Sequence, residues 1–80
     1  MLLGSFLMMT NTEKIKIITE YIELQQLLKK VNVVASGGEV KSFLSSHSVL
    51  VDGEEETRRG RKLYPGCLVE VLGKSYLITK

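Results

Sequence analysis

The stretch SGGEVKSFLSSHSVLVDG, at residues 36–53, decides the fold because its hydrophobic period changes part of the way along it. The first part predicts a helix beginning at Ser36, since Ser36 and Glu39 have the spacing of a capping box. Apolar positions in this part recur at the i, i+3, i+4, i+7 spacing of one helix face. The residues at these positions are Val40, Phe43, Leu44 and His47.

The second part of the stretch has the period of a strand followed by a tight turn. Val49 and Val51 flank Leu50, and Asp52-Gly53 is a strong hairpin signal. Pro65-Gly66 marks a further turn, of the kind that needs a glycine with positive φ. The remaining segments predict two strands and the turn between them, at residues 67–72, 75–79 and 73–74.

The residues upstream of this stretch predict one more strand and one more helix. KIKII, at residues 14–18, alternates polar and apolar side chains as a short strand does. A second amphipathic helix face, with residues 32–35 as the connector, consists of Leu24, Leu27, Leu28 and Val31. The predicted fold is therefore α+β, with a two-helix hairpin packed on a small, mainly antiparallel sheet.

Length and composition indicate one small globular domain. The chain has 80 residues, of which 44% are hydrophobic and 25% charged, and its net charge is only +2. We expect residues 1–12 to be an apolar leader, disordered or loosely packed, and residues 13–80 to form the domain. The leader lacks the basic residue and cleavage site of a signal peptide and is too short to span a bilayer, so no membrane partner is expected.

The side chains that most often build catalytic or metal sites are scarce. The single cysteine, Cys67, excludes an internal disulfide and suits a reducing cytoplasm. Together, Cys67 and His47 cannot supply the four ligands of a structural zinc site. We interpret His47 as a packing or capping residue and Cys67 as a packing residue. Tyr64 and Tyr76 could stack on bases, but the interpretation is that both pack in the core or sheet.

No set of residues indicates an enzyme. Glu54, Glu55 and Glu56 are adjacent, so on a strand or turn their carboxylates point in different directions. The chain also lacks a convergent acid–base set. We therefore predict a protein without catalytic activity, cofactor, metal or small-molecule substrate.

Two glycines stand where the second helix is expected to begin. The backbone N–H groups at a helix start lack partners within the helix and form a natural anion site. At Gly37 and Gly38 no Cβ would obstruct a phosphate, and Lys41 lies one turn away. The alternative is that the glycines only permit a tight turn between the helices, and the sequence does not decide between the two.

The run RRGRK, at residues 58–62, is the second candidate for anion binding. Arginine suits bidentate phosphate contacts and stacking on exposed bases. The alternative is a solvated charged loop, in which Glu54–Glu56 neutralise the arginines from just upstream.

These features, in this order, resemble the RNA-binding domain named after ribosomal protein S-four, also called the alpha-L motif. The resemblance covers about residues 20–73, and its closest branch is the small single-domain bacterial YaaA type, with YbcJ as a relative. The matching motifs are Leu24-x-x-Leu27-Leu28-Lys29, Ser36-Gly37-Gly38 with Lys41, Val49-x-Val51-Asp52-Gly53, Arg58-Arg59-Gly60-Arg61-Lys62-Leu63 and Pro65-Gly66.

The resemblance implies non-catalytic binding of structured RNA in ribosome maturation. Ribosomal RNA is the leading expected partner, transfer RNA the second, and the ribosome or an assembly intermediate a further one. The alternative is a protein-interaction module of a ribosome- or replication-associated assembly. Carried to matching positions, the expected RNA-binding residues are Lys29, Lys30, Ser36, Gly37, Gly38, Lys41, Arg58, Arg59, Arg61 and Lys62.

Overall fold

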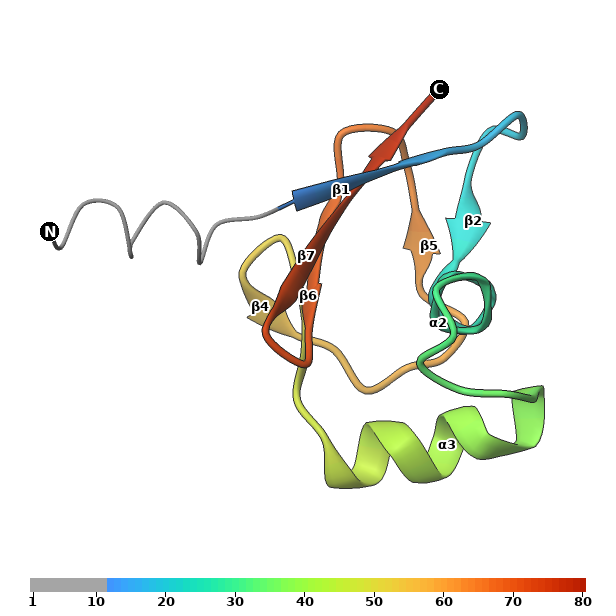
Figure 1. The fold of residues 1–80 in the computed structure, drawn as a ribbon, viewed down its shortest axis with the longest axis vertical. Coiled ribbons are helices and arrows are strands. Elements are labelled where there is room, and N and C mark those ends of the chain that lie inside the picture. The colour runs from blue at the N-terminus through green and yellow to red at the C-terminus, as the bar shows by residue number, and fades with distance from the viewer. Residues whose placement is uncertain (1–11) are drawn as a thin grey trace, which may run out of the picture.

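The computed structural model describes residues 12–80, so the expected leader lies outside the described residues except for Thr12. Figure 1 shows how the helices and short strands of this part are arranged. None of the helices in this part has the length and hydrophobicity needed to cross a membrane. The elements are β1 (Thr12–Lys16), β2 (Ile22–Glu23), α2 (Leu24–Lys30), α3 (Gly37–Ser46), β3 (Val49–Val51), β4 (Glu54–Glu55), β5 (Lys62–Leu63), β6 (Leu68–Val71) and β7 (Lys74–Thr79).

The strands form a five-stranded sheet in the order β1-β7-β6-β3-β4 and a separate pair, β2-β5. Only β1, which runs parallel to β7, departs from the antiparallel pattern. The predicted α+β fold with a mainly antiparallel sheet is thus confirmed. The strand β5 was not predicted: the basic run was interpreted as a loop throughout, but its last residue, Lys62, pairs with Glu23 of β2.

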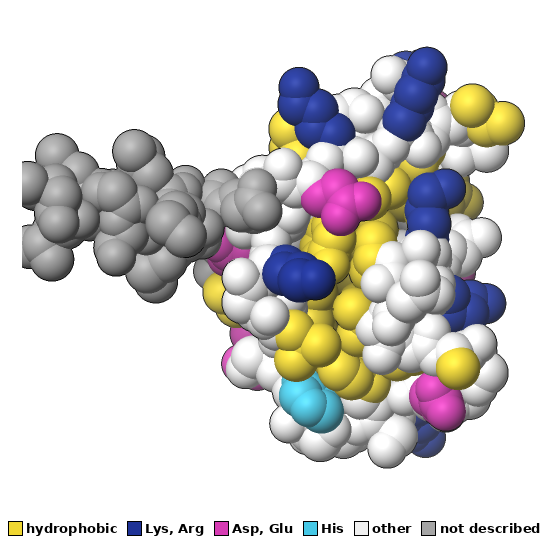
Figure 2. All heavy atoms as spheres, viewed as in Figure 1, with side chains coloured by type: hydrophobic (Ala, Val, Ile, Leu, Met, Phe, Trp, Pro, Cys, Tyr) yellow, Lys and Arg dark blue, Asp and Glu magenta, His cyan; other side chains and the backbone are white. Residues whose placement is uncertain are grey.

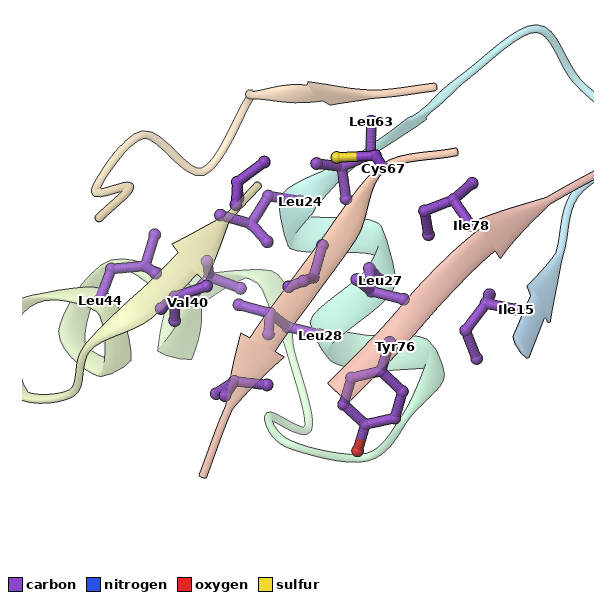
Figure 3. Close-up of a cluster of buried hydrophobic side chains, with 14 of the residues drawn as sticks. Ile15, Leu24, Leu27, Leu28, Val40, Leu44, Leu63, Cys67, Tyr76 and Ile78 are labelled. Carbon is purple, nitrogen blue, oxygen red and sulfur yellow. The ribbon is translucent and has the colours of Figure 1, made fainter. Parts of the chain in front are cut away.

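The core lies between the helices and one face of the five-stranded sheet. Figure 3 shows the leucines of α2 in one cluster with Ile15 of β1, Tyr76 and Ile78 of β7, and Val40 and Leu44 of α3. Fully burying one such side chain contributes roughly 1.5–3 kcal/mol to the free energy of unfolding. The apolar helix faces predicted from the sequence therefore largely determine the packing. The buried members include Ile15, Leu24, Leu27, Leu28, Val40, Leu44, Val49, Val51, Val69, Val71, Tyr76 and Ile78.

The predicted capping box at the start of α3 is wrong in detail. Ser36 is the N-cap residue, but its side chain makes no capping hydrogen bond. Glu39 Oε1 instead accepts a hydrogen bond from the Ala35 N–H at 2.8 Å, one residue before the cap. The reciprocal contact occurs at α2, where Gln26 Oε1 accepts from the Glu23 N–H at 2.9 Å.

The connector between the helices begins with a Schellman motif, which ends α2 and redirects the chain toward α3. Asn32 takes the left-handed position, with φ of 62°. Its N–H donates to the Lys29 carbonyl at 3.1 Å, and the Val33 N–H donates to the Leu28 carbonyl at 2.9 Å. These bonds satisfy the last carbonyls of α2 and fix where the next helix starts.

His47 is the C-cap residue of α3, which agrees with its interpretation as a packing or capping residue, and its side chain is exposed. Its N–H donates to the Phe43 carbonyl at 2.9 Å. The two rings stack with their centroids 4.3 Å apart and their planes 10° from parallel. The imidazole is therefore held as part of the helix end.

Two hairpins use two-residue turns with positive φ at both positions, as type I′ turns require. Asp52 and Gly53 form the predicted turn, with φ of 53° and 86°. The second turn falls one residue earlier than predicted, at Leu72 and Gly73, with φ of 52° and 74°. A left-handed conformation costs a side chain such as leucine about 1–2 kcal/mol, and Leu72 is also 59% exposed.

We therefore expect Leu72→Asn to raise the free energy of unfolding by about 0.5–1 kcal/mol in urea denaturation, because asparagine tolerates the left-handed region. Leu72→Ala is the control, because alanine also removes the exposed hydrophobic side chain but still pays the cost of the left-handed backbone conformation. A gain of the same size in both variants would show that exposed hydrophobic surface, and not φ, is what limits this turn.

Candidate nucleic-acid interface

The two glycines at the start of α3 have no internal reason to lack side chains. Neither Gly37 nor Gly38 has a positive φ. A Cβ on Gly37 would have no heavy atom within 4 Å, and one on Gly38 would meet only Ser36 Oγ at 4.0 Å. Steric crowding in the inter-helix turn therefore does not account for the glycines, because a Cβ has room at both positions.

The backbone amides of these glycines are open donors. The N–H groups of Gly37 and Gly38 donate to no acceptor within residues 12–80. Glu39 turns its carboxylate back to Ala35 and so leaves both groups accessible. The start of a helix carries partial positive charge, so this end of α3 is suited to an anion.

Three lysines belong to the same part of the chain. Lys29 and Lys30 form the last turn of α2, where cations oppose the negative end of the helix dipole. Lys41 lies one turn into α3, and all three are exposed. The connector at residues 31–36 joins the two lysines of α2 to the open amides of α3.

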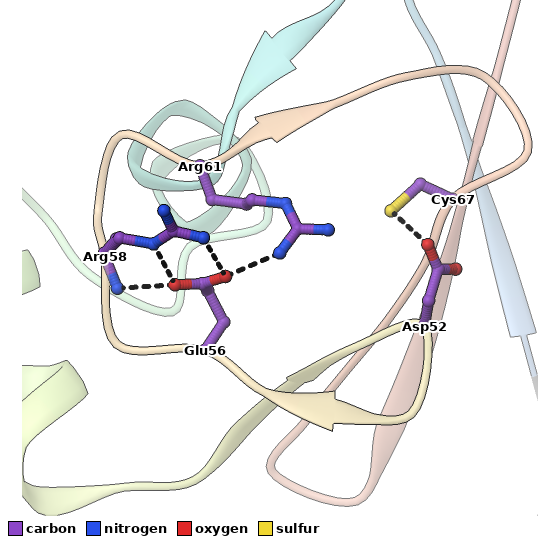
Figure 4. Close-up of polar contacts among 5 residues, drawn as sticks. All are labelled: Asp52, Glu56, Arg58, Arg61 and Cys67. Carbon is purple, nitrogen blue, oxygen red and sulfur yellow. Dashed lines mark hydrogen bonds and ion pairs between the residues drawn. The ribbon is translucent and has the colours of Figure 1, made fainter.

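The basic run lies in a loop organised around one buried glutamate. We call residues 56–62 the arginine loop. Glu56 is only 6% exposed and accepts four hydrogen bonds: three from Arg58, through the backbone N–H, Nε and Nη2, and one from Arg61 Nη1. Figure 4 shows the carboxylate between the two guanidinium groups. The alternative interpretation, in which the upstream glutamates pair with the arginines, is therefore correct for Glu56 alone. Glu54 and Glu55 are exposed on β4.

The ion pairs change the acidity of Glu56. Hydrogen bonds from Arg58 foremost, and from Arg61, lower the pKa of Glu56 from 4.5 to about 2, although burial opposes the shift. The same contact raises the pKa of Arg58. Arg59 and Lys62 form no ion pair with any residue in the range 12–80, so the loop keeps a net positive charge.

The arginine loop docks on the start of α2. The Leu24 N–H donates to the Arg61 carbonyl at 2.8 Å, and the Gln25 N–H donates to the Arg59 carbonyl at 2.9 Å. The loop thus lies at one end of α2, and the lysines of α2 and the start of α3 follow the other end. A seven-residue helix is about 10 Å long. Figure 2 shows Lys and Arg side chains at the edge of the molecule on the side where α2 lies.

Tyr21 and Tyr64 lie beside the arginine loop, and neither was identified as a site residue from the sequence. Tyr64 is 49% exposed, contrary to the expectation that it packs in the core or sheet, whereas Tyr76 is buried as expected. Tyr64 lines a surface pocket of about 600 Å³ together with loop residues. Its ring contacts that of Tyr21, whose face is covered by Lys62 Nζ at 5.0 Å from the ring centroid. The only sequence signal was the position of Tyr64 two residues after the end of the basic run.

Cys67 is a packing residue, as expected. It is buried, and its Sγ lies 3.5 Å from Asp52 Oδ2 (Figure 4). Burial foremost, and the Asp52 charge, raise the pKa of the thiol to about 11, so it stays neutral at physiological pH. Across residues 12–80, no three or more His, Cys, Asp or Glu side chains are grouped so that they could hold a metal.

The chain resembles known proteins in both family and sequence. A family model described as "S4 domain" matches residues 15–79. The chain is also similar to the "Probable ribosome maturation protein RlbA" of Bacillus subtilis (strain 168). The two sequences are 56% identical over 59 residues, which cover 74% of this chain and 83% of the Bacillus protein.

Proposed function

This chain belongs to the S4 domain family, and we propose that it binds structured RNA without catalysing a reaction. The further proposal is that it is an accessory factor in ribosome maturation, acting on ribosomal RNA in the cytoplasm. The name of the Bacillus protein, a ribosome maturation protein at 56% identity, supports this role. Transfer RNA is the second candidate ligand.

The observation that carries the proposal is the pair of glycines without an internal role. A glycine in place of alanine costs a helix up to about 1 kcal/mol. Nothing within residues 12–80 would collide with a Cβ at Gly37 or come closer than 4.0 Å to one at Gly38. A phosphate that approaches the open N–H groups from outside gives these positions a reason to lack side chains.

The distribution of charge supports the same ligand. Lys29 and Lys30 end α2 and Lys41 lies one turn into α3, while the arginine loop lies at the other end of α2. The start of α3 would hold phosphates of one RNA strand, and the arginines at the start of α2 would contact a neighbouring strand. Double-stranded RNA is read by shape because its deep major groove excludes side chains, which suits two cationic points about 10 Å apart.

The salt dependence of RNA binding tests this arrangement. Each phosphate contact adds about 0.7–0.9 to the slope of log K against log salt concentration. Arg59→Ala should lower that slope by about this amount, because Arg59 makes no ion pair in the described part of the chain and alanine keeps its carbonyl on α2. Arg58 is a less suitable target, because its removal also exposes Glu56.

The matched control is Lys74→Ala, which removes one exposed positive charge at the start of β7, away from α2. We expect the slope of this variant to equal that of the parent. Equal slopes for Arg59→Ala and the parent would remove the arginine loop from the interface. Binding partners in a cell extract that survive ribonuclease treatment would instead favour a protein-interaction module.

A further inference from the structure

We propose that Tyr64 and the arginine loop form a subsite for a single unpaired nucleotide, with the base stacked on the tyrosine ring and its phosphate held by the loop cations. This inference rests on the proposed RNA-binding function and specifies what the RNA must offer: a bulged or looped-out base next to a helical segment.

The ring of Tyr64 is exposed and supported from one side. Its centroid lies 5.6 Å from that of Tyr21, and the planes are tilted by 52°. A tilted contact of this kind is a favourable aromatic geometry. Because Tyr21 is tilted against Tyr64 and does not lie flat on it, the ring keeps an accessible surface. Tyr64 also borders a second, adjacent pocket of about 260 Å³ that includes Pro65 and Gly66.

The surroundings of the ring are cationic. The larger pocket is lined by Arg58, Gly60, Arg61, Lys62 and Tyr64. Arg58 and Arg61 share one ion-pair partner, Glu56, and Lys62 forms no ion pair within residues 12–80, so the pocket keeps a positive charge. Glu56 also bonds both guanidinium groups, which fixes them in place before a ligand arrives.

A flat aromatic surface beside fixed cations matches the chemistry of a nucleotide, which joins a π-face to a phosphate. Paired bases inside a helix cannot offer that face, because their neighbours stack on both sides of them, whereas bulges and loops leave bases free to stack on aromatic side chains. Stacking tolerates every base, so the subsite selects for an unpaired position and not for a particular base.

Two hairpin RNAs of the same sequence, one with a single bulged nucleotide and one without it, test the proposal. The parent protein should bind the bulged hairpin about 5- to 100-fold more tightly, the range that stacking of one base provides. Tyr64→Leu should abolish this preference and leave the affinity for the uninterrupted hairpin unchanged. Tyr64→Phe, which keeps the ring, should preserve the preference.

Urea unfolding of Tyr64→Leu shows whether the domain remains folded, and Tyr64→Phe separates the aromatic face from the hydroxyl. Equal affinity of the parent for the two hairpins would overturn the subsite while leaving RNA binding in place. An equal loss of affinity for both RNAs in Tyr64→Leu would also overturn it. Failure of the parent to bind either hairpin would contradict the proposed function itself.

Discussion

Replacing Glu56 with glutamine is expected to lower the free energy of unfolding by about 2–3 kcal/mol at neutral pH. The carboxylate accepts four hydrogen bonds from Arg58 and Arg61 in a position that is only 6% exposed. Glutamine keeps the size but loses the charge and turns an N–H₂ group toward a guanidinium donor. The two arginines would then lose their common partner, and the arginine loop its fixed path.

The same contact predicts how stability depends on pH. The pKa of Glu56 is about 2 in the folded protein, against an ordinary value of 4.5. Because the folded pKa is the lower one, the contribution of Glu56 is fully present above about pH 5 and is lost as the pH falls toward 2. Urea unfolding at a series of pH values should show this loss in the parent, and a smaller one in Glu56→Gln.

Glu54→Gln is the matched control, because it makes the same chemical change two residues away on the exposed surface of β4. A substitution there should alter the free energy of unfolding by less than about 0.5 kcal/mol. If the two glutamine variants had the same stability and the same pH dependence, the buried ion pairs would contribute nothing to folding.

The parts of the fold that depend on local sequence could be predicted. Helix faces follow from the spacing of residues such as Leu24 and Leu28, and the turn at Asp52 and Gly53 follows from side chains that tolerate positive φ. The strand β5 could not be predicted, because a strand of two residues is too short to show an alternating pattern of polar and apolar side chains. Its pairing with β2 also depends on where the carbonyls of the arginine loop meet α2. The capping glutamate of α3 reached Ala35 and not Ser36, a choice that sequence spacing does not resolve.

The candidate site was predictable in residue type but not in detail. Three glutamates precede the basic run, and nothing local indicates that only Glu56 points inward, since that depends on where β4 ends and the chain turns. The exposure of Tyr64 likewise depends on the position of the β2-β5 pair. The structure places the arginine loop at the start of α2 and the glycine pair beyond its end. Their joint role in RNA binding stays a prediction.

Replacing Gly38 is expected to change stability and RNA affinity in opposite directions. Gly38→Ala should raise the free energy of unfolding by about 0.5–1 kcal/mol, because the backbone is compatible with alanine and the Cβ meets no atom closer than 4.0 Å. Gly38→Glu should also fold, since an acidic residue in the first turn favours the helix dipole. In gel-shift measurements, however, it should weaken RNA binding by about 10- to 100-fold, because it places a negative charge where a phosphate is proposed to bind.

Gly38→Gln separates bulk from charge, because it has the length of glutamate without the carboxylate. We expect its affinity for RNA to fall between those of Gly38→Ala and Gly38→Glu, with the step from glutamine to glutamate shrinking as salt is added. A stabilised Gly38→Glu that binds RNA as tightly as the parent would show that the start of α3 does not face the RNA. The two glycines would then need another partner, since no contact within residues 12–80 accounts for them.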